Sequence, residues 1–597
     1  MGRTSQAQRG SCVTIGQFGG RVSRRSVLEG IGVGALGLAG AALLGCGGTK
    51  SGGDAGTSAG GGLGANQPKG TGLPLTAPVV QGKEKAGGTF TEHTTSSYTQ
   101  HDPHTALATN IWHVIGDKGL EPDPQTAAIR PHVLTSWEVS DPTTLVFKVK
   151  PGIKIHNMAP WNGREFTAED VAWNLERIGG LYADKLKTPL ASFQRASMVA
   201  NIAKAQAVDP TTVKVTLSKP NSSFFNGLMD TRVPFAPKEM DDIGWNDPLK
   251  MGGIGPFQIS EWVKDQKMNY KKSSTYFRPN EPHFDAFNWS IIPDRASAVA
   301  AFISGQTNMI SAVNQLEIDQ IKKSKPDANL YAWVDSNWHH FRPSTEYGPF
   351  KDLRVRKAIQ LGIDYAQIMD GFFGAGWGYQ AALSPGYPEG WKPEKVKSLA
   401  GYNPDTKAAD RAEAQKMLAA AGFPNGKGID FQIIFQNTSG TAYPENTQRF
   451  QAQMGSVFPE MKITLKPYAD NASFSVPQAK GEFQMVSYVI TASPDSVIEM
   501  QSQYYTGGSR NYGHFSDKNL DAMVDKAQVE LKTDARNAIM EDFQNKFIND
   551  WVPMYVLGAQ PARVMTQGNV GGFDTTAGLW YGYSATTKAC RWFFVDK

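Results

Sequence analysis

Cysteine is scarce in this sequence, which has three in 597 residues. Cys12 and Cys46 fall in the first 46 residues, which have the pattern of an export signal, so Cys590 is the one thiol expected in the processed chain. A single thiol excludes an internal disulfide. The chain must therefore be held together by apolar burial, and its length is enough for two large lobes or for three or four domains.

A large excess of positive or of negative charge is also lacking. The formal net charge is +4, and 19% of the residues are charged. Nucleic-acid-binding domains concentrate far more positive charge than this, so the composition excludes a nucleic acid as partner. The charge balance does not indicate any other partner.

Long hydrophobic runs of membrane-spanning length are missing from the leader. Its apolar stretch, Ile31 to Leu44, has about 14 residues, which suits a signal peptide and is too short to cross a bilayer. Arg24 and Arg25 precede it, which is typical of a twin-arginine export signal. Leu43-Leu44-Gly45-Cys46 resembles a lipobox and predicts Cys46 as the site of lipid attachment; the alternative is a plain secreted protein.

Residues 47–86 are rich in Gly, Ser and Ala and carry too few apolar side chains to form a core. This composition predicts a flexible linker. The folded part is expected to begin near Gly87.

Catalytic motifs in a suitable context are missing as well. A GxGxxG match at 32–37 falls within the export signal, and a GxSxG match at 56–60 falls within the linker. Neither has the strand, turn and helix that these motifs require. His101 and His104 have a spacing that a metal could use, but Asp102 is the one further ligand type beside them, so we predict no metal, no cofactor and no enzyme.

Trp137 to Ile178 is the most informative stretch that is present. Leu145, Phe147 and Val149 alternate with Val146, Lys148 and Lys150, which predicts a strand with one buried face. Pro151-Gly152 ends this strand. Thr167 and the acids that follow it predict a capped helix start, because side-chain oxygens satisfy the first free amides of a helix.

The order of these motifs, with PGIKIH between strand and helix, resembles that of the family 5 extracytoplasmic solute-binding proteins of bacterial ABC importers. Later segments extend the resemblance in family order: Ile254–Trp262, Tyr276–Pro279, Phe350–Ile359, Tyr402–Pro424 and Asn511–Phe515. No single motif is specific, whereas their common order is.

The resemblance implies an α/β fold with two lobes, like the periplasmic binding proteins, and an extra α+β subdomain on the first lobe. We expect these bounds: signal peptide 1–46, linker 47–86, first lobe 87–119, inserted subdomain 120–240, first lobe again 241–310, second lobe 311–551, and completion of the first lobe by 552–597. Ligand would be buried as the lobes close.

The resemblance and the aromatic content of such sites also imply ligand contacts. The predicted ligand-binding residues are Tyr98, His101, Trp338, His340, Arg342, Trp377, Asp495, Tyr504 and Tyr505. Peptide-binding members carry an aspartate upstream of Asp495, and this chain has none between Tyr488 and Ala492. Arg342 adds a cation where the family has a small polar residue in a loop, so an anionic ligand group is one reading and a structural bridge to Asp335 or Glu346 is the other.

The resemblance implies a solute-binding lipoprotein outside the cytoplasm, in the periplasm or on the outer face of the cytoplasmic membrane. It would be a lipid-anchored monomer that passes a peptide-like or other small solute to the permease of an ABC transporter. The alternatives are a ligand-sensing or chaperone-like binding protein without a transporter and, less favoured, a secreted hydrolase.

Replacing Cys46 by Ala should release the protein from membranes or leave an unprocessed precursor, because the lipid would have no attachment site. Fractionation and mass spectrometry of the N-terminus would measure this. A variant with Lys at positions 24 and 25 should stay inside the cell, and continued export of that variant would indicate the general secretory route.

Overall fold

The computed structural model describes residues 78–95, 97, 100–106, 110–122, 129–311, 313–374, 377–385, 387, 389–437, 442–573 and 589–596. The predictions for Arg24, Arg25, Cys46 and Tyr98 lie outside the described residues. No helix of the described part is both long and apolar enough to cross a membrane.

The strand and helix expected within Trp137 to Ile178 are confirmed. Strand β7 (Thr144–Val149) buries Leu145, Phe147 and Val149. Helix α3 (Ala168–Ile178) follows, and the Asp170 carboxylate accepts the Thr167 N–H at 2.9 Å. Strand β7 belongs to a four-stranded antiparallel sheet of order β6-β7-β9-β8. The other strands are β6 (Leu134–Asp141), β8 (Ile202–Asp209) and β9 (Thr212–Leu217).

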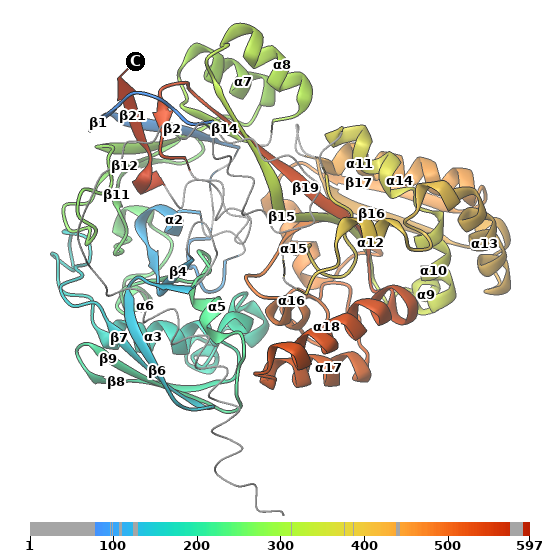
Figure 1. Cartoon of the computed structure of the whole chain (residues 1–597), viewed down its shortest axis with the longest axis horizontal. Coiled ribbons are helices and arrows are strands. Elements are labelled where there is room, and N and C mark those ends of the chain that lie inside the picture. The colour runs from blue at the N-terminus through green and yellow to red at the C-terminus, as the bar shows by residue number, and fades with distance from the viewer. Residues whose placement is uncertain are drawn as a thin grey trace, which may run out of the picture. The chain divides into compact units, whose positions relative to one another are not determined.

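Ten strands of the described residues form one larger mixed sheet of order β11-β12-β13-β2-β14-β19-β15-β18-β16-β17. Strands β15 (Asn329–Pro343) and β19 (Tyr555–Thr566) lie side by side near its middle (Figure 1). The other members are β2 (Thr89–Thr94), β11 (Phe257–Val263), β12 (Lys267–Lys272), β13 (Ala286–Ile291), β14 (Met309–Ser311), β16 (Asp430–Gln436), β17 (Lys462–Tyr468) and β18 (Met485–Thr491).

Small sheets and short helices complete the first lobe. The remaining strands are β1 (Lys83–Lys85), β3 (Asp117–Lys118), β4 (Leu120–Pro122), β5 (Ile129–Pro131), β10 (Pro234–Phe235), β20 (Val570–Gly571) and β21 (Phe593–Asp596). The short helices there are α2 (Trp112–Ile115), α4 (Ala183–Leu186), α5 (Phe224–Leu228) and α6 (Met240–Ile243).

The later helices begin and end at residues suited to those places. Asp294 caps α7 (Arg295–Ser304), and Gly305 stops it at φ 83°. The other helices are α8 (Gln315–Ser324), α9 (Gly348–Lys351), α10 (Leu353–Gly362), α11 (Tyr365–Phe373), α12 (Pro393–Lys397), α13 (Lys407–Ala420), α14 (Ala442–Val457), α15 (Asn471–Lys480), α16 (Ser496–Gln503), α17 (Lys518–Val529) and α18 (Thr533–Lys546).

Two large hydrophobic cores divide the described residues. The first core contains Phe147, Phe224 and Trp592, and thus includes the four-stranded sheet. The second core contains Phe450 and Phe547 and is covered by helices α10 to α18 apart from α15. Because β15 and β19 contribute residues to both cores, they carry the chain between the lobes.

Arg177 on α3 ties three segments of the first lobe together. Its guanidinium makes paired hydrogen bonds of 2.7 and 2.8 Å to Asp102 and further bonds to Asp241. His104 Nδ1 lies 2.9 Å from the same guanidinium. The Arg177 side chain is 2% exposed, so these carboxylates compensate a charge that water cannot reach.

We expect Arg177→Met to lower the free energy of unfolding by about 3–5 kcal/mol, because it strands two poorly exposed carboxylates. Arg354→Met is the matched control. Arg354 also pairs with an aspartate, Asp352, but its side chain is 55% exposed. Its loss should cost about 1 kcal/mol or less in urea unfolding, and equal losses for the two variants would contradict the argument.

Candidate functional site

The segment that carries His101 and His104 is packed into the first lobe. The backbone oxygen of His101 accepts the Trp112 Nε1–H at 2.6 Å, and the His101 ring lies edge-on to Trp262. Burial, and then the charge of Arg177, lower the pKa of His104 to about 3. His104 is therefore neutral and uses Nδ1 as an acceptor toward Arg177. Within the described ranges, no group of three His, Cys, Asp or Glu side chains is placed to hold a metal ion.

Strand β15 carries the predicted residues Trp338, His340 and Arg342 along one face. The Trp338 and His340 rings lie 5.3 Å apart, and each side chain is 1% exposed. His339 points the other way, between Ser487 at 2.9 Å and Asn446 at 3.0 Å. Burial lowers the pKa of His339 to about 3 and puts the pKa of His340 well below its usual value. These rings are neutral interior groups of the second lobe.

Arg342 does not lie in a loop, as we expected from the sequence, but within β15, where it pairs with Val486 of β18. Its side chain is 1% exposed. Nη2 donates to Gln503 Oε1 at 2.7 Å, Nη1 donates to the Arg510 carbonyl oxygen, and the guanidinium lies over the Tyr512 ring. Burial lowers the pKa of Arg342 to about 10.

The expected bridge from Arg342 to Glu346 is not formed. Glu346 instead lies 2.9 Å from His514 Nδ1. Arg342 is thus solvated by neutral oxygens and an aromatic face, and within the described residues its Nε has no hydrogen-bond partner. These contacts favour a structural role, and contact with a ligand stays a prediction.

Three further aromatic predictions also have protein partners. Tyr504 is fully buried, and its hydroxyl donates to the Ala382 carbonyl oxygen at 3.0 Å. Tyr505 OH reaches Asp525 at 3.4 Å from the edge of the second core. Trp377 Nε1 donates to Asp370 at 2.6 Å, and this ring is partly exposed.

Asp495 connects the two lobes. It caps α16 through Val497 N at 2.9 Å, and Arg536 of the second lobe donates to it at 2.6 Å. From α5 and the residue before it, Ser223 Oγ donates at 2.5 Å and Asn226 Nδ2 at 2.8 Å. Burial opposes ionisation, but Arg536 and these hydrogen bonds outweigh it and hold the pKa of Asp495 below its usual range.

A buried ion pair adjoins this contact. Arg232 binds Asp230 with distances of 2.9 and 2.6 Å, and both residues are 1% exposed. Arg232 Nη2 also donates to the Ala492 carbonyl oxygen at 3.1 Å. The Arg232 side chain of the first lobe therefore contacts the loop between the end of β18 and Asp495.

A small cavity of about 110 Å³ adjoins the crossing strands. Its lining includes aromatic side chains and one cation: Val313, Asn314, Phe372, Phe373, Ala442, Tyr443, Val489, Gln560, Pro561 and Arg563. Binding pockets for small molecules usually measure roughly 300–1,000 Å³, so this cavity has room for a group of side-chain size and not for a whole solute.

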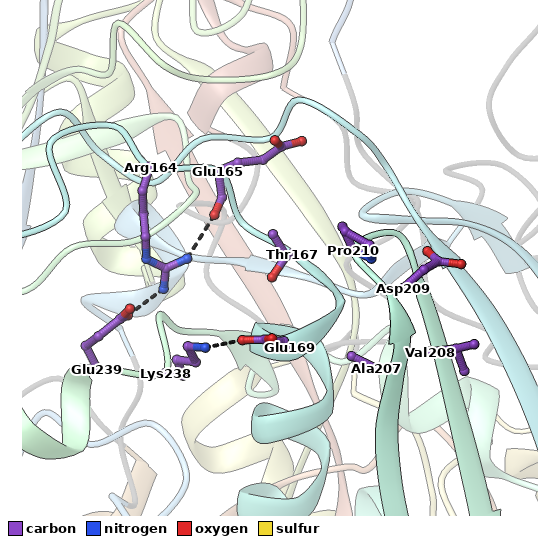
Figure 2. A pocket seen from close by; sticks show the side chains of 10 residues that line it. All are labelled: Arg164, Glu165, Thr167, Glu169, Ala207, Val208, Asp209, Pro210, Lys238 and Glu239. Carbon is purple, nitrogen blue, oxygen red and sulfur yellow. Dashed lines mark hydrogen bonds and ion pairs between the residues drawn. The ribbon is translucent and has the colours of Figure 1, made fainter.

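A larger hollow of about 450 Å³ lies beside the four-stranded sheet and the start of α3 (Figure 2). Its charged walls are already paired with one another. Arg164 binds Glu239 and the Glu165 backbone oxygen, and Lys238 binds Glu169. These pairs give the hollow no convergent unpaired group with which to orient a ligand.

The contacts thus put the predicted residues in three places. His101 belongs to the first lobe, Trp338, His340, Arg342 and Tyr504 lie inside the second, and Asp495 joins the two. Sequence reasoning missed Arg177, Arg232, Ser223 and Asn226. The one local signal was the Asp230-Thr231-Arg232 sequence, which is compatible with a short-range ion pair.

Comparison with known families decides the relationship. The family described as bacterial extracellular solute-binding proteins, family 5 (middle region), matches residues 128–512, more than half of the chain. The chain belongs to this family. Its members are binding proteins, and the family is extracytoplasmic.

Two curated members of family 5 are similar in sequence. The glutathione-binding protein GsiB of Escherichia coli (strain K12) is 25% identical over 364 residues, or 60% of this chain and 66% of that protein. The heme-binding protein A of Haemophilus influenzae is 24% identical over 478 residues, or 76% of this chain and 84% of that protein. The chain therefore spans slightly less than two thirds of the glutathione-binding relative.

A solved structure supports the two-lobed α/β fold. The periplasmic binding protein DppA of Helicobacter pylori, in complex with the peptide STSA, has a TM-score of 0.73 to this chain. The sequence identity is 20%, and the match covers 86% of this chain and 99% of that one. The two-lobed fold expected from the sequence is thus confirmed.

Arg342→Met should lower the free energy of unfolding by about 1–3 kcal/mol, because Gln503 and the Arg510 carbonyl oxygen would lose a buried donor. Urea unfolding of the ligand-free protein would measure this loss. Unchanged stability, with binding of the natural solute weakened more than tenfold, would instead assign Arg342 to the ligand.

Proposed function

We propose that this protein captures a small solute between its two lobes and delivers it to the permease of an ABC transporter. The observation that carries the proposal is the division of a family 5 chain into two cores that share strands β15 and β19. Two rigid bodies joined by a few strands can close around a ligand by a hinge motion. The same architecture supports a binding role without catalysis.

We further propose that the solute is peptide-like or carries an anionic group. The relatives differ in what they bind, so the ligand class rests on this chain's own residues. Thr491, in the stretch that lacks the expected aspartate, donates to Asn337 at 2.5 Å, which makes a neutral pair. Arg510 Nη1 donates to the Thr491 carbonyl oxygen at 3.2 Å and adds positive charge there. Positive charge beside this neutral pair favours an anion over a free amine.

The proposed location is the outer face of the cytoplasmic membrane or the periplasm, with a lipid on Cys46 as anchor and export by the twin-arginine route. Support comes from the leader sequence and from the family's extracytoplasmic character. The Gly- and Ser-rich segment 47–86 would give the lobes reach from the membrane. We propose that the protein acts as a monomer.

Native mass spectrometry of the protein purified from its own host should reveal a bound solute. That solute, added back at 100 times its dissociation constant, should stabilise the protein by roughly 2.7 kcal/mol and reduce its radius of gyration. A solute that raises the melting temperature without compaction would contradict closure, and failure to stimulate uptake by the permease in vesicles would favour sensing.

A further inference from the structure

We propose that the inserted subdomain is a latch that holds the two lobes together before any solute binds, with Asp495 as its central group. The latch consists of Ser222, Ser223, Asn226 and Arg232 on the first-lobe side and Thr491 to Asp495 and Ala527 to Gln528 on the second. The latch would act in the chain without solute, and it does not depend on the proposed transport function.

The first argument is the division of hydrogen bonds around Asp495. Val497 N and Arg536 belong to the same lobe as Asp495, so their hydrogen bonds to its carboxylate persist in the open and in the closed arrangement. Ser223 and Asn226 come from the first lobe. A carboxylate that is already fixed and ionised within its own lobe is a preorganised acceptor, so docking Ser223 and Asn226 costs little reordering on that side.

Backbone groups make a second set of contacts at the same junction. Ser222 N donates to the Gln528 carbonyl oxygen at 2.8 Å, and Ser222 Oγ donates to the Ala527 carbonyl oxygen at 3.3 Å. These oxygens lie at the C-terminal end of α17, where the last carbonyls of a helix have no partner within it. The first lobe therefore caps a helix of the second.

Apolar packing supports the same contact. Ile498 on α16 is 1% exposed and belongs to the first core, whereas its neighbours Val497 and Met500 belong to the second. At another point of the same contact, Arg232, which is paired with Asp230, donates to the Ala492 carbonyl oxygen. Polar and apolar contacts between the lobes thus occur together near the start of α16.

All first-lobe members of the latch fall between residues 222 and 232, which precede the end of the inserted subdomain. They are far in sequence from β15 and β19, the strands that join the lobes. On the second-lobe side, Thr491 pairs with Asn337 of β15. A contact between the lobes in addition to the crossing strands resists the bending of these strands and shifts the balance between open and closed forms toward closed. The lobes would then be mostly closed when a solute arrives. Binding of the solute would either replace this contact between the lobes or form in addition to it.

The test measures hydrogen exchange in ligand-free protein, from which any solute has been removed by unfolding and refolding. In the unaltered chain, the Ser222 amide and helix α5 should be protected. In a Ser223→Ala, Asn226→Ala double variant, the ratio of open to closed molecules should rise about tenfold for each bond removed from Asp495. The rate of hydrogen exchange at the Ser222 amide should rise with this ratio, while the amides of α3 should exchange as slowly as in the unaltered chain.

Ser218→Ala is the matched control, because its hydroxyl donates to Asn201 within the same subdomain and does not reach the second lobe. It should leave exchange at Ser222 unchanged. Should the double variant fail to fold, Asn226→Asp serves instead, since it sets a second carboxylate against Asp495 and should open the lobes. Fast exchange at Ser222 in the unaltered chain, or unchanged exchange and radius of gyration in Asn226→Asp, would overturn the latch.

Discussion

The pairing of β15 with β19 is the constraint on which the two-lobed arrangement depends. β15 is 15 residues long and pairs with β19 on one edge and with β18 on the other. Tyr331 near its start belongs to the first core and Phe341 near its end to the second. The register with β19 shifts between Val334 and Trp338, between these two residues. A local irregularity there bends the strand where the lobes meet without breaking either core.

Local sequence signals predicted much of the fold. Caps such as Asp294 and Asp517 and left-handed glycines such as 305 and 422 can be read from the sequence, because each depends on one turn of backbone. The alternating strand ending at Val149 was also readable, since one of its faces is exposed. Motif order then predicted the two-lobed architecture.

The interior of the second lobe could not be read in the same way. Trp338 to Arg342 mixes aromatic and polar residues without alternation, because β15 is buried on both faces and the hydrogen-bond partners of His339 and Arg342 lie far away in the sequence. Gln503, which accepts from Arg342, is 161 residues distant. Position 342 therefore looked like an exposed cation in a loop. The latch around Asp495 was hidden for the same reason, since Ser223 lies 272 residues away.

The buried neutral rings of His104 and His339 make the folded chain a weak proton acceptor. In the unfolded chain each ring takes up a proton near pH 6.5, whereas in the folded protein it does so only at about pH 3. Unfolding in mild acid is therefore accompanied by proton uptake, and each ring lowers the free energy of unfolding by up to about 1.4 kcal/mol per pH unit as the pH falls from 6.5 toward 3. Above pH 6.5 the two rings have no such effect. These interior imidazoles thus help to set the lowest pH at which the protein stays folded outside the cytoplasm.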